Sequence, residues 1–510
     1  MRITTQYCPE QKDDSKAILK VLSMKEVEKA PGPLIGFVAS GSGATTCTIL
    51  LVEGLEDKVR EETFSMVRDG DRWLLGVIRS GTGIDDNLQS GRYSPGIAYA
   101  KRGHAPSSAR RSFHYTFSVI GQVKDDGLEE NRQVIHPGSS AYLVQDRNPF
   151  SAFKHNDYLW AGNYWECEDW QIPFHKDFIP YHIGVYGTTG CGKSFLTRFL
   201  LIPLLEQAGC GVLVLDWEGR DYARYMPKNT VLVSQVKMDI DTVVTYICSR
   251  ANHFGYYGSQ RENNRIRQAL EYLLRTYESG EESWRMKSEF ELGDWLESEV
   301  KQHLEMSEGK RADYLQMYKA RVAAGLQRIE NKHWATILGK MEPKDLVERA
   351  KSDGLLILDM AAVGSDEKLA FFKSLGGHIR ERLEEGEDLD LALIIDEGPQ
   401  YAPWQPRGIQ IDTTDLIQDL CALGRKHRLS ITMIAQGMAG DIGINAAIRR
   451  NLNTHFIGQI HPLDMEEASN WLNPYHIPVE RLLRMKPGQF YFIGKMNPSP
   501  TPLLISFKVK

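Results

Sequence analysis

The sequence predicts an α/β core, in which a parallel sheet carries helices on both faces, together with an N-terminal small β-barrel and a helical insertion. Short apolar runs separated by glycine turns fill the first part of the chain, strand–helix alternation fills the core, and one long charged segment has helical spacing throughout. The expected division is a barrel over residues 1–150, a core over 151–239 and 351–475, the insertion over 240–350, and C-terminal strands over 476–510.

Composition limits the class of protein. The chain has 510 residues, of which 42% are hydrophobic and 25% charged, as is usual for a soluble protein of several domains. Its net charge of −6 argues against a generally basic nucleic-acid coat but allows a local basic channel. The 7 scattered cysteines form no C-x-x-C pair, which indicates a reducing cytosol and no zinc cluster. No signal-peptide core or bilayer-spanning apolar run is present, so we expect a cytoplasmic protein with no membrane partner.

The amino-terminal region has the pattern of a small barrel. Residues 34–38, 47–52 and 72–78 are short apolar runs, and residues 113–119 alternate between apolar and polar side chains, as in a half-buried strand. Glycine turns separate these runs and no helical crossover pattern interrupts them. We therefore expect this region to form a barrel apart from the α/β sheet.

The remaining chain has the rhythm of a parallel sheet with helical crossovers. Buried strands are expected at residues 211–215, 355–358, 391–395 and 430–435, with two late strands at 490–493 and 503–509. In the insertion, one helix face is predicted to carry Ile266, Leu270, Leu273, Leu274 and Tyr277. We expect this insertion to pack on the core.

A glycine-rich loop near the start of the core fits the pattern G-x-x-x-x-G-K-[ST] at every fixed position. Its residues are Gly187, Thr188, Thr189, Gly190, Cys191, Gly192, Lys193 and Ser194. A short apolar run precedes it and a run with helical spacing follows it, so the loop joins a buried strand to a helix. Glycines let backbone N–H groups turn inward at a helix N-terminus and hold phosphates. All eight residues are therefore predicted to bind ATP.

Three residues of the loop have further predicted roles. Lys193 is expected to reach the β- and γ-phosphates, and the Ser194 hydroxyl to bind Mg²⁺. Cys191 lies near a helix N-terminus, so it is either a reactive thiol or, as the more ordinary interpretation, a small filler residue.

An apolar run at residues 391–395 ends in two adjacent carboxylates, Asp396 and Glu397. The carboxyl edge of the sheet is where the phosphate loop is expected too, so Asp396 is predicted to hold the Mg²⁺ shell. Glu397 is then free to orient and polarise an attacking water. A strand that simply ends in a solvated acidic turn is the alternative, and the phosphate loop upstream favours hydrolysis of ATP.

Two polar groups after the acidic pair complete the predicted site. Gln436 follows the strand at 430–435 and is expected to sense the γ-phosphate, with a turn amide bonded to backbone as the alternative. Arg425 ends a helix that we place near the carboxyl edge, where a neighbouring subunit could dock. It is predicted to stabilise charge on a partner's γ-phosphate, with Arg449 and Arg450 in reserve. Complementing the helix dipole is its ordinary alternative role.

An acidic cluster follows the second core strand. Asp216 and Glu218 are expected to contact metal-bound water, to couple the ATP state to a neighbour, or to form a solvated strand end. Spacing leaves these interpretations open.

The order of these motifs resembles the HerA family of FtsK/HerA translocase ATPases. GTTGCGKS is followed by LDWEGRDY, similar to the family's D-x-x-G-E-Y stretch, and by LLILDMAAV, which resembles its hydrophobic strand ending in Asp. LIIDEGPQYAP, GRKHRLSITMIAQ and IRRNLNTHFIGQI resemble its later segments, and DGDRWLLGVIRSGTGIDDNL is similar to its capping barrel. Gly398-Pro399 departs from the family's usual Ala-His, and the family's Glu maps to either Glu218 or Asp221.

The resemblance implies a RecA-like P-loop ATPase core in a homohexameric ring that uses ATP to move along double-stranded DNA as a translocase or helicase. It also implies an arginine supplied between subunits, and a nuclease partner on the barrel for DNA-end processing in repair. Some relatives work instead with effectors in antiphage defence. An ATP-binding ring that chiefly scaffolds or regulates a nuclease or NAD-hydrolysing effector is therefore the second expectation. A small-molecule kinase and a secretion ATPase fit the residues less well, because a kinase needs no water-orienting Glu and no membrane segment is evident.

Overall fold

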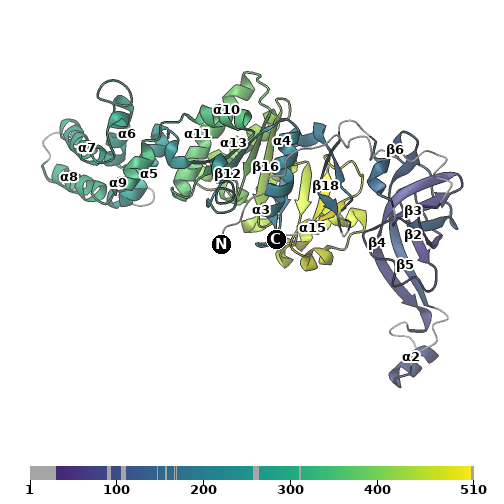
Figure 1. Cartoon of the computed structure of the whole chain (residues 1–510). Coiled ribbons are helices and arrows are strands. Elements are labelled where there is room, and N and C mark those ends of the chain that lie inside the picture. The colour runs from purple at the N-terminus through teal and green to yellow at the C-terminus, as the bar shows by residue number, and fades with distance from the viewer. Residues whose placement is uncertain are drawn as a thin grey trace, which may run out of the picture.

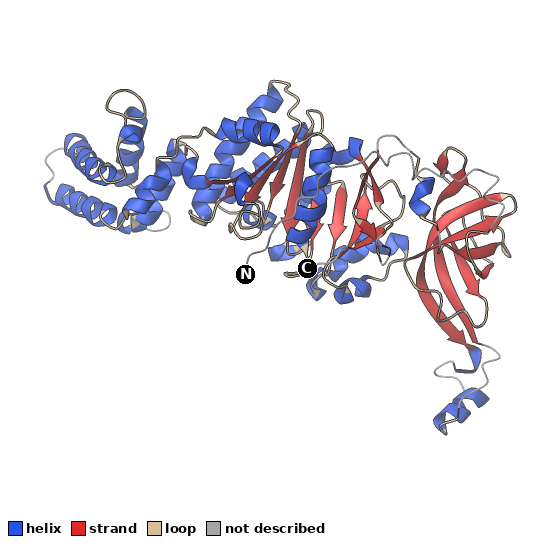
Figure 2. Cartoon of the chain, viewed as in Figure 1, coloured by secondary structure: helices blue, strands red, loops and turns tan. Residues whose placement is uncertain are grey.

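The structure is a computed structural model, and it describes residues 30–88, 94–104, 111–145, 147–154, 158–165, 167, 169–256, 264–308 and 312–506. A β-barrel and a group of helices lie at opposite ends of a central α/β core (Figures 1 and 2). The predicted fold class is confirmed: an α/β core with an N-terminal barrel and a helical insertion.

The barrel closes because its first and last main strands pair with each other. Its strands are β1 (Leu34–Val38), β2 (Thr46–Leu51), β3 (Thr63–Asp69), β4 (Arg72–Asp85), β5 (Arg111–Lys124) and β7 (Ser140–Leu143), with β6 (Gly127–Glu129) added on β5. Their order is β2-β1-β7-β3-β4-β5, and β5 returns to pair with β2. The alternating pattern of residues 113–119 points Phe117 into the closed barrel, where it is fully buried.

Strands β4 and β5 continue past the barrel as a two-stranded arm, which the sequence pattern did not predict. Figure 1 shows this arm with α2 (Pro95–Lys101) at its tip. Residues 81–84 are exposed there, in contrast to the buried run before them. Ser94 begins α2 by accepting a hydrogen bond from the Ile97 N–H at 3.2 Å.

The core is one ten-stranded sheet in the order β13-β14-β12-β15-β16-β11-β17-β18-β19-β9. The strands are β9 (Asn163–Tyr164), β11 (Ile183–Tyr186), β12 (Gly211–Asp216), β13 (Thr230–Leu232), β14 (Leu355–Asp359), β15 (Leu391–Ile395), β16 (Leu429–Ala435), β17 (Thr454–Ile457), β18 (Gln489–Gly494) and β19 (Leu503–Ser506). Neighbours from β13 to β17 are parallel, as predicted, whereas β18, β19 and β9 are antiparallel. Of these, only β18 and β19 follow one another by a short link, residues 495–502, which suits an antiparallel pair, since a parallel pair would need a longer crossover. The part of the expected last strand beyond residue 506 lies outside the described residues.

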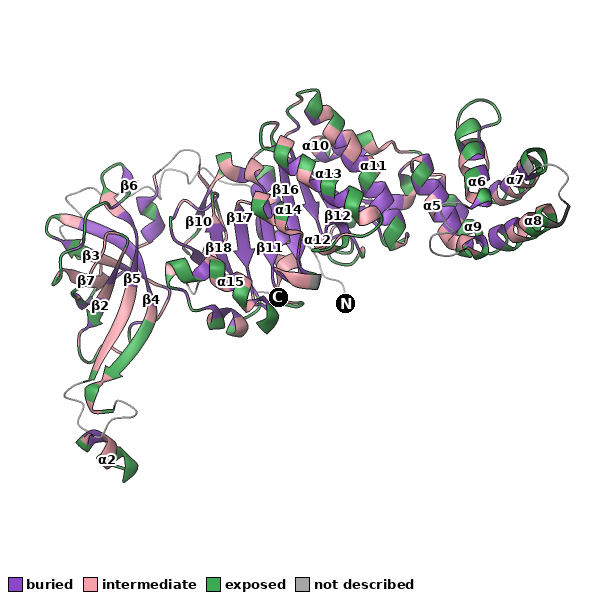
Figure 3. Ribbon diagram, turned by 180° about the vertical axis from the view of Figure 1, so that it is seen from behind, coloured by how far each residue is buried: buried purple, intermediate pink, exposed green. Residues whose placement is uncertain are grey.

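Both faces of this sheet are covered, so its parallel strands are apolar on both sides (Figure 3). Leu213 and Leu215 pack in the same cluster as α11 (Ser365–Glu384) and α13 (Ile409–Gly424). Val212 and Val214 face the other way, toward α4 (Ile202–Gln207). Predicted helices on both faces are therefore observed.

The residues between β13 and β14 are helical, as expected. They form α5 (Ile240–Arg250), α6 (Arg265–Thr276), α7 (Leu292–Glu308), α8 (Ala312–Leu326), α9 (Asn331–Ile337) and α10 (Pro343–Asp353). Ile266, Leu270, Leu273 and Leu274 are buried on one face of α6, as the spacing predicted, and Tyr277 is partly buried beside them. Helices α6 to α9 extend away from the sheet, whereas α10 packs on β12 and β14 (Figure 1). No helix among the described residues is both long and apolar enough to cross a membrane.

A buried arginine joins the barrel to the core. Arg79, in β4, is 1% exposed. Its guanidinium donates hydrogen bonds to the Thr501 hydroxyl, to the Pro502 carbonyl and, at 3.2 Å, to the Tyr475 carbonyl. Its Nε lies 3.4 Å from Oε1 of Glu62, a barrel residue that is 2% exposed.

Further hydrogen bonds surround this pair. Two core tyrosines donate to Glu62: Tyr491 to Oε1 at 3.0 Å and Tyr164 to the backbone carbonyl at 2.7 Å. At the margin, Arg481 of the core pairs with Glu61 of the barrel at 3.0 Å. The barrel is thus held to the core by directional polar contacts as well as by apolar packing.

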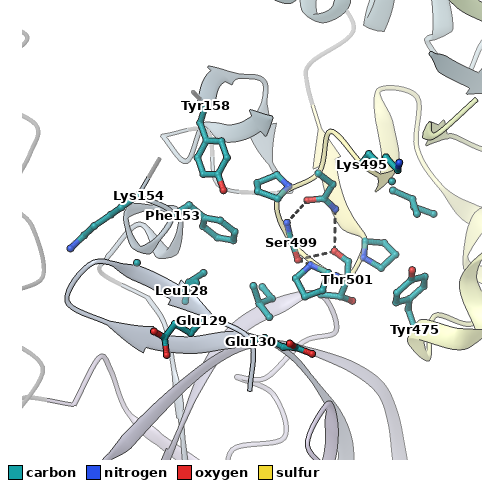
Figure 4. A pocket seen from close by; sticks show the side chains of 18 of the residues that line it. Leu128, Glu129, Glu130, Phe153, Lys154, Tyr158, Tyr475, Lys495, Ser499 and Thr501 are labelled. Carbon is teal, nitrogen blue, oxygen red and sulfur yellow. Dashed lines mark hydrogen bonds between the residues drawn. The ribbon is translucent and has the colours of Figure 1, made fainter. Parts of the chain in front are cut away.

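A cleft of about 700 Å³ lies beside this junction (Figure 4). Glu129 and Glu130 of the barrel line one side, and the proline-rich link at 498–502 lines the other. Asn453 and Gly494 lie at the amino end of β17 and the carboxyl end of its antiparallel partner β18. The cleft is therefore at the amino edge of the parallel strands, away from the phosphate loop.

His182 makes the fold sensitive to acid. It is fully buried at the start of β11, where Nε2–H donates to the Cys421 carbonyl (2.8 Å) and Nδ1 accepts from the Ile431 N–H (3.1 Å). Burial lowers the pKa of His182 to about 4, and the Cys421 carbonyl opposes this shift. As pH falls below the unfolded-state value, the unfolded chain binds a proton that the folded chain does not. Stability should therefore fall by about 1.4 kcal/mol per pH unit between pH ~6 and ~4 from this group.

Urea unfolding at a series of pH values measures this slope. His182→Gln should flatten it, while the same change at the exposed His104 should not. An unchanged slope in His182→Gln would assign the acid sensitivity to other groups.

Candidate active site

The phosphate loop and the acidic pair meet at the carboxyl edge of the sheet. The loop follows β11, and Asp396 and Glu397 follow β15. Strand β16 lies between β11 and β15 and is parallel to both. Gln436, directly after β16, therefore lies between the loop and the acidic pair, as its position in the sequence predicted.

Two glycines give the loop its shape. Gly187 has φ 153°, and a Cβ there would lie 2.6 Å from the Cys191 sulfur. Gly192 has φ 105° and begins α3 (Lys193–Leu196). The Lys193 ammonium donates to the carbonyls of Gly187 (2.7 Å) and Thr188 (3.2 Å), so it lies over the concave side of the loop. The ammonium is therefore held against the loop whose N–H groups are predicted to bind phosphates.

Cys191 is a structural residue in this loop. Its side chain is 1% exposed, and burial raises the pKa of its thiol. Its carbonyl accepts a hydrogen bond from the Gly488 N–H at 2.9 Å, which ties the loop to the turn before β18. The structure favours the filler interpretation over a reactive thiol.

Asp396 is a buried carboxylate, 5% exposed. Burial raises its pKa well above the usual range, and the nearby carboxylates of Glu397, Asp221 and Asp216 raise it further. A divalent cation would offset this excess of negative charge. Asp396 and the Ser194 hydroxyl are hard oxygen ligands, which fit Mg²⁺. No cluster of three or more ligating side chains is found among the described residues, and Mg²⁺ commonly binds through one or two carboxylates, phosphates and water.

Glu397 has an unusual backbone and two connected partners. Its φ of 49° and ψ of 48° lie in the left-handed region, and it begins the short helix α12 (Gly398–Tyr401). Its Oε1 accepts a hydrogen bond from Gln436 Nε2 at 2.9 Å, and Gln436 Oε1 accepts one from Thr189 Oγ1 at 3.3 Å. A continuous chain of side chains therefore connects the phosphate loop to Glu397.

The departure at Gly398 has a packing reason. A Cβ at this position would lie 2.9 Å from the end of the Met433 side chain and 3.2 Å from the Ile434 carbonyl oxygen. Glycine lets α12 pack closely on β16, so an alanine here would require Met433 to move.

The predicted location of Arg425 is wrong. It follows α13, and its guanidinium lies 6.0 Å from the ring of Tyr181, just before β11. A helix that joins two parallel strands runs back along the sheet, so its C-terminus lies at the amino edge. Arg425 is therefore at the opposite end of β11 from the phosphate loop of its own chain. It can reach a nucleotide only on a neighbouring copy.

The reserve arginines lie in the last turn of α14 (Ala446–Asn451), the helix that leads into β17. Arg449 is occupied, because it donates to the Met438 carbonyl and lies 3.3 Å from Glu467. Arg450 is exposed.

One residue of the acidic cluster after β12, Asp216, has a structural role. Asp216 is fully buried and accepts hydrogen bonds from the N–H groups of Gly219 (2.9 Å), Tyr222 (3.0 Å) and Ala223 (3.0 Å). It shapes the turn after β12. Glu218 and Asp221 are on this turn, and Asp221 is close enough to raise the pKa of Asp396.

Sequence reasoning missed a buried group behind this turn, formed by Trp217, Lys368 and Tyr401. The Lys368 ammonium donates to the Trp217 carbonyl at 2.6 Å, and the Trp217 and Tyr401 rings are 5.0 Å apart. The signal available was weak: a tryptophan directly after an apolar strand and a lysine in the first turn of an amphipathic helix.

A parallel sheet with a glycine-rich loop, a carboxylate pair and a terminal amide at its carboxyl edge defines a P-loop ATPase, and the enzyme is an ATP hydrolase. Residues 161–376 match the family model described as Helicase HerA, central domain. The predicted resemblance to the HerA family is thereby confirmed. The matched segment contains the phosphate loop and ends before Asp396. No curated protein matches the chain.

Several solved structures are similar to this chain at low identity. VirB4 of Thermoanaerobacter pseudethanolicus is 14% identical over 70% of this chain and 98% of its own, with a TM-score of 0.44. The bacterial conjugative coupling protein TrwB is 16% identical over 66% of this chain and 87% of its own, with a TM-score of 0.42. The genome packaging NTPase B204 of Sulfolobus turreted icosahedral virus 2 is 10% identical over 65% of this chain and 99% of its own, with a TM-score of 0.32.

Proposed function

We propose that this chain is an ATP-driven translocase that moves along double-stranded DNA as a homohexameric ring, with a nuclease partner on its barrel for DNA-end processing. The observation that carries the proposal is the chain of hydrogen bonds from Thr189 through Gln436 to Glu397. It links the phosphate loop to a carboxylate suited to orient water, which motor ATPases need and small-molecule kinases do not.

Each residue has a distinct part in the proposed hydrolysis. Lys193 and the loop N–H groups hold the phosphates, while Ser194 and Asp396 would hold Mg²⁺. The metal, when bound, neutralises charge on the phosphate oxygens. Glu397 accepts a proton from the water that attacks the γ-phosphorus. Gln436, which bonds to both Glu397 and Thr189, would respond when the γ-phosphate leaves.

The position of Arg425 supports a ring. In a closed ring, each interface joins two different surfaces of neighbouring copies. An arginine at the amino edge can then face a phosphate loop at the carboxyl edge of the next copy. Arg425 would supply positive charge to that neighbour's transition state, so hydrolysis would depend on assembly.

The loops at the carboxyl edge offer contacts for DNA. Trp404 is 47% exposed, Arg407 is exposed three residues later, and Ile442 in the adjacent loop is 47% exposed. Residues Pro403 and Ile444 bridge these two loops. Contacts to the DNA backbone from such loops would be insensitive to sequence and weakened by salt.

The expected result for purified protein is ATP hydrolysis that duplex DNA stimulates several-fold, with the stimulation lost as salt is raised from 50 to 200 mM. A coupled assay for ADP release, with and without a random-sequence duplex, measures this. Lys193→Ala serves as the inactive control.

An opposite result would favour the second expectation. If hydrolysis is slow and indifferent to duplex DNA while the ring still forms, the chain is better described as an ATP-binding scaffold for an effector, as in antiphage defence. A monomer that hydrolyses ATP at the full rate would contradict both.

A further inference from the structure

A buried lysine lies behind the acidic edge of the sheet, with no part in the hydrolysis described above. Lys368, in the first turn of α11, is 7% exposed. Its ammonium donates to the Trp217 carbonyl at 2.6 Å and lies 4.5 Å from the centre of the Trp217 ring. We propose that Lys368 is a positioning residue for Glu397, acting through Trp217 and Tyr401. The proposal rests on the proposed role of Glu397 in hydrolysis.

The contacts form a short path to Glu397. The Trp217 ring meets the Tyr401 ring edge to face, with centroids 5.0 Å apart. Tyr401 is the last residue of α12, the single helical turn that begins at Glu397. The ring of Phe372 holds Tyr401 from α11 at 4.9 Å, and Thr413 donates to the Tyr401 carbonyl at 2.5 Å. One end of α12 is therefore clamped while the other carries the carboxylate.

The backbone conformation of Glu397 explains why α12 needs these contacts. Glu397 has a left-handed backbone, which a non-glycine residue keeps only where its surroundings enforce it. A helix of a single turn cannot enforce this by its own hydrogen bonds. The burial of Tyr401 between Trp217 and Phe372 can.

Charge explains why the group behind Trp217 is a lysine. Asp216, Glu218, Asp359 and Glu367 all lie close enough to favour the charged form of Lys368, and their effect opposes the lowering of its pKa by burial. An ammonium here offsets part of the negative charge of the turn after β12. It also holds the Trp217 carbonyl in place through the hydrogen bond that it donates. These nearby carboxylates and the hydrogen bond lower the free-energy cost of burying the ammonium, which would be much higher for an unpaired cation.

The test compares Lys368→Met with Lys373→Met, a matched change at an exposed lysine five residues along the same helix that pairs with Asp412. We expect Lys368→Met to lower kcat on the order of 10- to 100-fold, as small displacements of a reacting group do. KM and the affinity for a fluorescent ATP analogue should change less than about twofold, because the phosphate loop is untouched. Lys368→Arg should recover part of kcat, and Lys373→Met should match the unchanged protein.

A second pair of variants separates positioning from general packing. In the Glu397→Gln background, Lys368→Met should lower the residual single-turnover rate by less than about twofold, because residues that act through one another are not additive. An equal fall in both backgrounds would overturn the proposal. If Lys368→Met does not fold, Lys368→Gln, which retains a donor for the Trp217 carbonyl, takes its place in both backgrounds. Full kcat in Lys368→Met defeats this proposal alone, whereas ATP binding without hydrolysis by the unchanged protein defeats the proposed function instead.

Discussion

Glu397→Gln is expected to bind ATP with unchanged affinity and to hydrolyse it roughly 10²- to 10⁴-fold more slowly. Glutamine has the same shape, and its carbonyl oxygen can still accept the hydrogen bond that Gln436 donates at 2.9 Å. What it cannot do is accept a proton from water. The loss should therefore appear in kcat and not in nucleotide binding.

Single-turnover hydrolysis and titration with a fluorescent ATP analogue measure the two quantities separately. Glu384→Gln, at a side chain 58% exposed on α11, is the control for a lost carboxylate. Hydrolysis at the ordinary rate in Glu397→Gln would remove this residue from the chemistry, and a loss of binding would give it a role in holding nucleotide instead.

The active-site motifs could be predicted because their chemistry is local. A phosphate loop needs glycines, a lysine and a hydroxyl within eight residues, and all of these are consecutive in the chain. Asp396, Glu397 and Gln436 could be placed because each directly follows an apolar strand, and the carboxyl ends of parallel strands meet at one edge. The rules of α/β topology therefore brought together residues far apart in sequence.

The same rules, applied to a helix, would have placed Arg425 correctly. A crossover helix begins at the carboxyl edge and ends at the amino edge, so a residue after α13 cannot lie beside the phosphate loop of its own sheet. The burial of His182 against the end of this helix confirms the direction. A charged residue at a helix end does not by itself indicate which edge of the sheet that end lies on.

Other features depend on contacts that no local pattern encodes. The group of Lys368, Trp217 and Tyr401 comes from three separate segments. Arg79 and Thr501 are 422 residues apart in the chain. In the sequence, Arg79 directly follows the apolar run at 72–78, and this local pattern does not show that its side chain is buried. The pairing of barrel and core buries it, and only tertiary structure shows this.

Arg79→Met is expected to give the largest loss of stability, about 3–5 kcal/mol, because it leaves the buried Glu62 carboxylate without its nearest counter-charge. It also leaves the Pro502 and Tyr475 carbonyls without a donor. Since these carbonyls belong to the core and Glu62 to the barrel, the two parts should unfold separately in the variant. Scanning calorimetry would then show a low-temperature barrel transition split from that of the core.

Two further variants decide whether the buried charge is the cause. Arg132→Met removes a surface ion pair of the same barrel, in which the side chains are 82% and 72% exposed, and should cost no more than about 1 kcal/mol. Glu62→Gln combined with Arg79→Met removes both charges and should recover part of the lost stability, because the cost of a broken buried pair lies mainly in the partner left behind. If the double variant is as unstable as Arg79→Met, the lost hydrogen bonds to the core carbonyls, and not the unpaired Glu62, hold the barrel in place.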